Sequence, residues 1–159
     1  MSSRRVVSAA RPDPLVSRAV WQAQHAIEQA FDALLEPIGL SAALAGTLTF
    51  LAEAPGVSTA ELARRAGVTA QSMAYATGRL EQLGLIVRTP HPVHGRIMQL
   101  DLTQSGRRAL DRASAIIAPA EEALTAELSR AGRRELLDHL AGLRQRARHL
   151  RDVAVTTSD

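Results

Sequence analysis

The chain has 159 residues, of which 46% are hydrophobic and 22% charged, and its net charge is +3. These values predict one folded domain and exclude a chain that is disordered throughout. The chain contains no cysteine, which excludes disulfides, thiol nucleophiles and thiol redox sensors. No run approaches the ~18 apolar residues of a membrane span, and the apolar stretch near the start is too short for a secretory signal, so we expect a cytoplasmic protein without a membrane partner.

The first predicted element is a helix over residues from about 14 to 38, because apolar side chains recur there on one stripe at helical spacing. The stripe includes Val16, Val20 and Ile27. Ser41 then opens a second, largely apolar helix, which Pro55 and the glycine after it end.

Two short helices joined by a tight turn are predicted next. Ser58 and Glu61 have the spacing of a capping box, which satisfies the free N–H groups of a first helical turn. Gly67 lies where the helix ends, since glycine adopts a positive φ without steric cost. Thr69 can cap the helix that follows. This segment therefore predicts a helix-turn-helix.

The second of these helices has an apolar face, on which Met73, Ala76 and Leu80 recur, and a polar face opposite. A β-hairpin is predicted directly after it. This order is typical of a winged helix-turn-helix, whose second helix enters the major groove of DNA. We predict that the DNA-binding residues are Thr69, Gln71, Ser72, Tyr75, Arg79, His94 and Arg96.

The charge distribution supports a phosphate-binding face on the same segment. All 19 basic residues are arginines. Residues 64–112 contain eight of them against three acidic residues, a net charge of +5, so the rest of the chain carries −2 of the total of +3. A basic segment that coincides with the helix-turn-helix and the hairpin is the electrostatic pattern expected of a DNA-binding module.

Helices are predicted again after the hairpin. Thr103 caps a long helix that Pro119 should kink, and Ala131 with Gly132 is expected to break the chain before a last helix. The last helix carries a narrow apolar seam. With the first helix it predicts a dimer interface, formed by Val16, Val20, Ile27, Leu136, Leu140, Leu143 and Leu150. The alternative is that these side chains pack within one chain.

The run from about Leu34 to Leu110 resembles the MarR (multiple antibiotic resistance regulator) family. Three motifs carry the resemblance: Gly39-Leu40-Ser41 at the second helix, Leu80-Glu81-Gln82-Leu83-Gly84-Leu85-Ile86-Val87-Arg88 at the end of the recognition helix, and Leu102-Thr103-Gln104-Ser105-Gly106 at the following helix. The resemblance implies a triangular homodimer with DNA-binding lobes at its base. It also implies transcriptional control, often by repression that a small ligand relieves.

One motif departs from the family pattern. Members usually carry Asp-x-Arg at the tip of the wing, and the corresponding triplet here is His94-Gly95-Arg96. The carboxylate that orients the arginine is thus replaced by a histidine, which accepts a hydrogen bond when neutral and repels the arginine when protonated.

Other chemistry has little support in the sequence. His91 and His94 lack a third ligand nearby, so we expect no metal site, and we expect no cofactor because no glycine-rich phosphate loop is present. Ser72 and Ser105 have no partner that suggests nucleophilic activation, so we expect no enzyme. Trp21 is expected to pack in the core or in an interface.

The predicted fold is mainly α with a small β-hairpin, a winged helix-turn-helix plus N- and C-terminal dimerisation helices. The expected parts are a disordered N-terminus (1–12), a dimerisation helix (13–40), the DNA-binding lobe (41–103), dimerisation helices (104–153) and a disordered tail (154–159). The predicted function is a dimeric repressor that binds an inverted-repeat operator in double-stranded DNA and responds to a small aromatic or lipophilic effector. The alternatives are a winged-helix DNA-binding protein without an effector, and a protein-interaction module.

Overall fold

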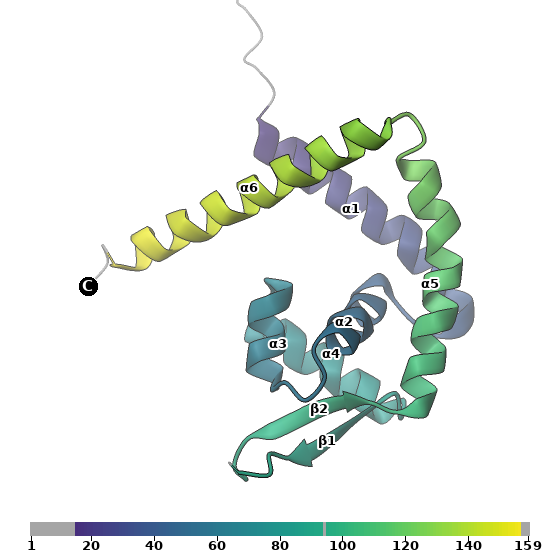
Figure 1. Ribbon diagram of the computed structural model, residues 1–159, viewed down its shortest axis with the longest axis vertical. Helices are drawn as coiled ribbons and strands as arrows, with labels where there is room; N and C mark the ends of the chain where they lie inside the picture. The colour runs from purple at the N-terminus through teal and green to yellow at the C-terminus, as the bar shows by residue number, and fades with distance from the viewer. Residues whose placement is uncertain (1–14, 94, 157–159) are drawn as a thin grey trace, which may run out of the picture. The chain divides into compact units, whose positions relative to one another are not determined.

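The computed structural model describes residues 15–93 and 95–156, and the chain divides into two units between Ile116 and Ile117. The first unit holds α1 (Val16–Leu35), the 3₁₀ helix η1 (Glu36–Ile38), α2 (Ala42–Glu53), α3 (Thr59–Ala66), α4 (Ala70–Gln82), β1 (Ile86–Pro90) and β2 (Met98–Leu102). It also contains the start of α5 (Gln104–Leu124). The second unit holds the rest of α5 and α6 (Arg130–Thr156) (Figure 1).

The segment from Ala42 to Leu102, called the lobe below, combines three short helices with an antiparallel hairpin (Figure 1). The centre of its core includes five leucines from α2, α3, α4 and β2 that are 0% exposed, namely Leu48, Leu51, Leu62, Leu80 and Leu100. Val57, just before α3, forms an isolated antiparallel β-bridge with Leu100 of β2. This fold confirms the predicted winged helix-turn-helix.

The helix starts follow the predicted capping chemistry. Ser41 Oγ accepts a hydrogen bond from Leu44 N over 3.2 Å, and Thr103 Oγ1 accepts one from Gly106 N over 3.0 Å. The start of α2 is also joined to α1, because Ala42 N donates to Asp32 Oδ1 over 2.7 Å. Side-chain oxygens therefore satisfy N–H groups that the first turn of a helix leaves without partners.

Three of the element boundaries predicted from the sequence were wrong. The first helix does not continue to residue 38 as one α-helix, because residues 36–38 form η1, with Pro37 in it. The expected break at Ala131 and Gly132 lies inside α6; Ser129 Oγ instead accepts from Gly132 N over 3.1 Å and so caps the helix earlier. The disordered tail predicted from residue 154 is wrong for residues 154–156, which belong to α6. Residues 1–14 and 157–159 lie outside the described part of the chain.

Helices α1 and α6 each present apolar side chains to solvent within their own unit. On α1, Val16, Val20 and Ile27 are exposed by 59%, 38% and 36%. None of the α6 side chains that the structure describes is buried, and exposure ranges from 38% to 70% for its predicted interface leucines, Leu136, Leu140, Leu143 and Leu150.

Trp21 was expected to pack in the core or in an interface. It does not pack in the core of the first unit. The side chain is 64% exposed, and its ring stacks on that of His25 with centroids 5.6 Å apart. Among the described residues no single helix has the length and apolarity of a membrane span; Val16–Ile38 and Ala42–Glu53 reach them only as a pair bent by 84°. Buried leucines of the first unit lie in both members of that pair.

Candidate nucleic-acid interface

The helix-turn-helix is fixed by two caps and one glycine. Ser58 Oγ accepts from Glu61 N over 3.2 Å, and Thr69 Oγ1 accepts from Ser72 N over 3.0 Å. Gly67 ends α3 with a φ of 73°, a left-handed conformation that disfavours side chains. These local interactions set the turn, and so they set where α4 begins.

Helix α4 presents its predicted polar face to solvent. Gln71, Ser72, Tyr75 and Arg79 are all exposed, and Tyr75 reaches 78%. The opposite face is held in the core by Met73, Ala76 and Leu80. The Thr69 and Ser72 hydroxyl oxygens, 2.8 Å apart, hydrogen-bond to each other, so part of their capacity serves the cap.

A groove of about 630 Å³ lies between the start of α2 and the exposed side of α4. Gln71, Ser72, Tyr75 and Arg79 line it from α4, and Leu40, Ser41 and Leu44 line it from the other side. The predicted DNA-reading residues thus border a concave surface beside the recognition helix.

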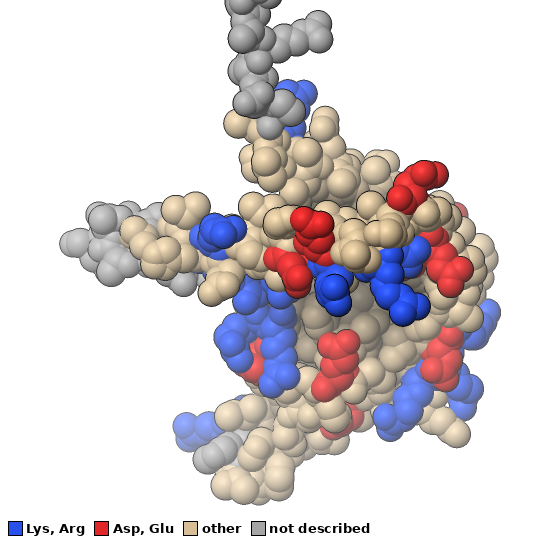
Figure 2. Space-filling model, turned by 45° about the horizontal axis from the view of Figure 1, so that its top comes forward, with Lys and Arg blue, Asp and Glu red and all other residues tan. Residues whose placement is uncertain are grey.

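The hairpin forms the predicted wing. Strands β1 and β2 pair antiparallel from Ile86 with Leu102 to Pro90 with Met98. Arg96 is exposed between the strands, and His94 lies outside the described residues. Basic surface lies at the tip of the hairpin, at the lower left of Figure 2, where all blue residues are arginines because the chain contains no lysine.

A second basic cluster lies on α3. The Glu61 carboxylate accepts hydrogen bonds from Arg64, at 2.8 and 2.7 Å, and from Arg65, at 2.7 Å. The hydrogen bond with Arg64, and then that with Arg65, lowers the pKa of Glu61 from 4.5 to about 2. The predicted capping box is therefore half correct: Ser58 caps α3, while the Glu61 side chain binds the two arginines.

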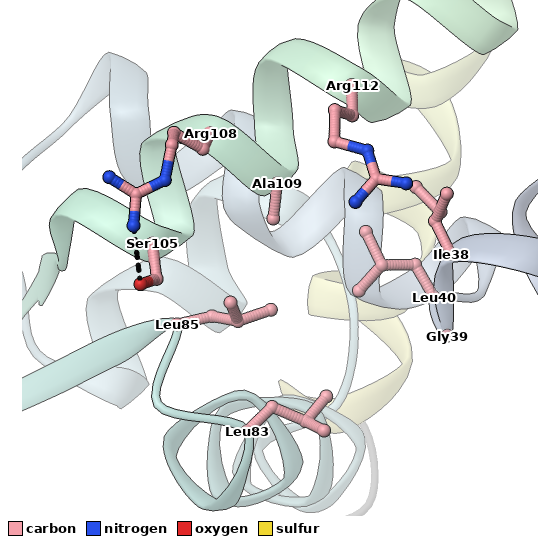
Figure 3. Close-up of a pocket in the computed structure, with 9 residues that line it drawn as sticks. All are labelled: Ile38, Gly39, Leu40, Leu83, Leu85, Ser105, Arg108, Ala109 and Arg112. Atoms are coloured by element: carbon pink, nitrogen blue, oxygen red, sulfur yellow. Dashed lines mark hydrogen bonds between the residues drawn. The ribbon is translucent and has the colours of Figure 1, made fainter.

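A smaller pocket of about 390 Å³ lies where the end of α4 meets the start of α5. Leu40, Leu83, Leu85 and Ala109 give it an apolar wall, and the guanidinium groups of Arg108 and Arg112 lie on opposite sides of Ala109 in Figure 3. Arg108 also donates to Ser105 Oγ over 3.1 Å.

The joint beneath this pocket is tight. Thr103 Oγ1 donates to Gly84 O over 2.7 Å, and Thr103 N donates to Leu85 O over 3.0 Å. Gly106 packs directly on the Leu85 carbonyl, where a side chain would not fit, because an added Cβ would lie 1.9 Å from that oxygen. The floor of the pocket is thus fixed to the end of the recognition helix.

Sequence reasoning missed Arg88, Arg108 and Arg112 as site residues. All three were counted in the basic segment, and Arg88 was also named as the last residue of a family motif. The partners of Arg88 precede it by 11 and 29 residues, so no local spacing rule identifies its role. In the described part of the chain, no group of three or more His, Cys, Asp or Glu side chains is placed to hold a metal ion.

Comparison with known proteins places this geometry in a family. The MarR family model matches residues 38–97. The HTH-type transcriptional repressor Rv2887 of Mycobacterium tuberculosis (strain ATCC 25618 / H37Rv) is 37% identical over 103 residues, which are 65% of this chain and 74% of that protein. The chain belongs to the MarR family of transcriptional regulators.

Solved structures of MarR-family proteins share the fold. The transcriptional repressor CouR bound to a 23-mer DNA duplex has a TM-score of 0.74 at 33% identity, over 81% of this chain and 92% of that one. The same repressor bound to p-coumaroyl-CoA has a TM-score of 0.71 at 32% identity, over 81% and 91%. The M. tuberculosis protein Rv2887 in complex with salicylic acid has a TM-score of 0.65 at 31% identity, over 83% and 98%.

Proposed function

We propose that this MarR-family chain is a homodimeric, sequence-specific DNA-binding repressor whose hold on its operator is relieved by a small anionic ligand with an apolar body. The observation that carries the DNA-binding part is the exposed polar face of α4, with Tyr75 78% exposed, followed at once by a wing that carries Arg96. A helix of this kind reads base edges in the major groove while a wing arginine reaches the backbone or the minor groove.

The dimer part of the proposal rests on the apolar side chains of α1 and α6. A stripe of leucines that is 38% to 70% exposed on one helix is more apolar surface than a lone chain usually leaves in water. A two-fold dimer buries the same stripe on both copies at once. Two recognition helices related by that axis would read an inverted repeat with half-sites about one helical turn, ~34 Å, apart.

The ligand part rests on the pocket with the arginine pair, Arg108 and Arg112 (Figure 3). Its volume of about 390 Å³ suits a small molecule. Its apolar wall suits an aromatic ring, and guanidinium groups suit a carboxylate or phosphate. Since Leu83 at the end of α4 forms part of the wall, a bound ligand would contact the end of the recognition helix. Salicylic acid, bound by one relative, has an aromatic ring and a carboxylate, and p-coumaroyl-CoA, bound by the other, has an aromatic acyl group on a much larger body that carries phosphates.

We infer a cytoplasmic regulator rather than an enzyme, in keeping with its family. The test is a fluorescence titration with a duplex that the wild-type protein selects from a random library, followed by salicylate or p-coumaroyl-CoA. We expect the ligand to release the duplex and Arg112→Leu to require more of it. Binding that no such compound reverses would favour a repressor without a small-molecule effector. A lack of any DNA binding would favour a protein-interaction module.

A further inference from the structure

Arg88 joins three elements of the lobe through a single guanidinium group. It lies in β1, where its side chain is only 26% exposed. Its Nε donates to Glu81 Oε2 over 2.8 Å, and its terminal nitrogens donate to Thr59 Oγ1 over 3.1 Å and to Thr77 Oγ1 over 3.0 Å. Glu81 and Thr77 belong to α4, and Thr59 is the first residue of α3. One side chain of the wing therefore binds both helices of the helix-turn-helix.

Thr77 makes this contact specific. It is 0% exposed on the inward side of α4, and its hydroxyl donates to Met73 O over 2.9 Å. A hydroxyl has one proton and two lone pairs, so its oxygen remains able to accept the proton of Arg88. The guanidinium thus reaches a fixed, buried point on the recognition helix, in addition to the more exposed Glu81.

A planar guanidinium is suited to this arrangement. Its N–H groups point in fixed directions, so three acceptors on two helices define where each helix lies relative to β1. A lysine ammonium is a compact charge on a flexible stem and does not define the same geometry. All three nitrogen atoms of Arg88 have partners within the lobe, so they are turned away from the exposed polar face of α4.

We propose that Arg88 is a positioning residue for DNA recognition, which holds α4 and the wing in one geometry so that Tyr75, Arg79 and Arg96 meet the duplex together. This inference rests on the proposed DNA binding. It predicts a particular defect. Because Arg88 touches no DNA in this role, its loss should reduce discrimination between sequences and leave attraction to phosphates intact.

The experiment compares two duplexes of equal length, one selected by the wild-type protein from a random library and one with the same bases scrambled. For Arg88→Lys and Thr77→Val we expect affinity for the selected duplex to fall about tenfold, while affinity for the scrambled duplex stays within about twofold. The slope of log affinity against log salt should not change, whereas loss of a phosphate contact would reduce it by about 1.

Thr47→Val is the matched control for Thr77→Val. Thr47 is also buried, at 4% exposure, and its hydroxyl also donates to the carbonyl four residues earlier, Ala43 O, over 2.8 Å. The two variants remove the same group from the same kind of site and differ in the contact with Arg88. We expect Thr47→Val to keep the wild-type ratio of selected to scrambled affinity.

The outcomes distinguish a failure of the proposed DNA binding from a failure of the positioning role of Arg88. A wild-type protein that selects no sequence overturns the proposed function. A wild-type protein that selects one, with Arg88→Lys and Thr77→Val keeping its ratio or losing affinity for both duplexes equally, overturns the positioning role alone. Should Arg88→Lys fail to fold by circular dichroism, the pair Thr77→Val and Thr47→Val still gives the answer.

Discussion

Leucine side chains are buried in the lobe but exposed on the last helix. Leucines of the lobe such as Leu48 and Leu80 are 0% exposed, while Leu140 and Leu150 of α6 are 40% and 70% exposed in their own unit. The lobe satisfies its apolar surface with residues from four of its own elements. Helix α6 does not, and we propose that its leucines pack against a partner surface. This contrast underlies the proposal of a DNA-reading lobe joined to a dimerising helix.

The largest expected effect comes from placing charge in the stripe of α6. The double substitution Leu140→Asp and Leu143→Asp should convert the dimer to a monomer, because two buried carboxylates per chain oppose association. Operator affinity should fall by about 100-fold or more, since each half-site then has to be bound independently. Light scattering and a binding titration measure the two effects.

Gln145→Asp is the control for this change, because it adds a carboxylate to α6 outside the leucine stripe. It should leave both the dimer and the operator affinity as they are. A double variant that stays dimeric with full affinity would show that these leucines pack against their own chain.

A core substitution in the lobe should lower the free energy of unfolding by the same amount at any protein concentration. Leu80→Ala removes a side chain that is 0% exposed and should lower the free energy of unfolding by about 2–5 kcal/mol. Leu137→Ala, at a leucine of α6 that is 66% exposed, should stay within about 0.5 kcal/mol. Chemical denaturation at two protein concentrations checks both. Equal losses of stability at the two leucines would contradict the difference in burial between the lobe and α6.

Arg96→Ala should weaken DNA binding by about 1–3 kcal/mol, because it removes a predicted wing contact. A loss that depends on the sequence bound would indicate a contact to base edges, and a uniform loss would indicate a phosphate contact. Arg144→Ala, on α6, serves as the charge-matched control. Unchanged operator affinity for Arg96→Ala would remove the wing from the interface.

The smallest expected effect is a dependence of stability on acid. The pKa of Glu61 is about 2 in the folded chain against 4.5 for the ordinary group. A lowered folded pKa stabilises the lobe above pH 4.5, and this contribution is lost as the pH falls from there through about 2. The ion pairs are exposed, so salt should weaken the effect. Urea unfolding of the wild type and of Glu61→Gln across this pH range measures this contribution. If the free energy of unfolding of the two proteins falls identically as the pH is lowered, the ion-pair assignment is contradicted.

The sequence predicted those features that depend on local chemistry. The caps at Ser41, Ser58, Thr69 and Thr103 were all found, because each depends on a side chain and an N–H group only a few residues apart. The break expected at Gly132 failed for a related reason. A glycine interrupts the middle of a helix, but three residues after a capping serine its N–H group completes the first turn.

Interactions between distant residues were not predictable. Arg88 reaches Thr77 and Thr59, which precede it by 11 and 29 residues, and no spacing rule connects them. The pocket beside Arg112 likewise draws its wall from η1, the α4–β1 turn and α5. The polar face of α4 was predictable from periodicity alone, while the contacts that hold it in place required the fold.

The measurement that tests the account most directly is hydroxyl-radical footprinting on a duplex that the wild-type protein selects. We predict two protected patches, related by a two-fold axis and about one helical turn, ~34 Å, apart, with two chains bound per duplex. Leu140→Asp with Leu143→Asp should abolish the paired protection at the same protein concentration. A single protected patch with one chain bound, unchanged by that double variant, would contradict the claim that α6 joins two DNA-reading lobes.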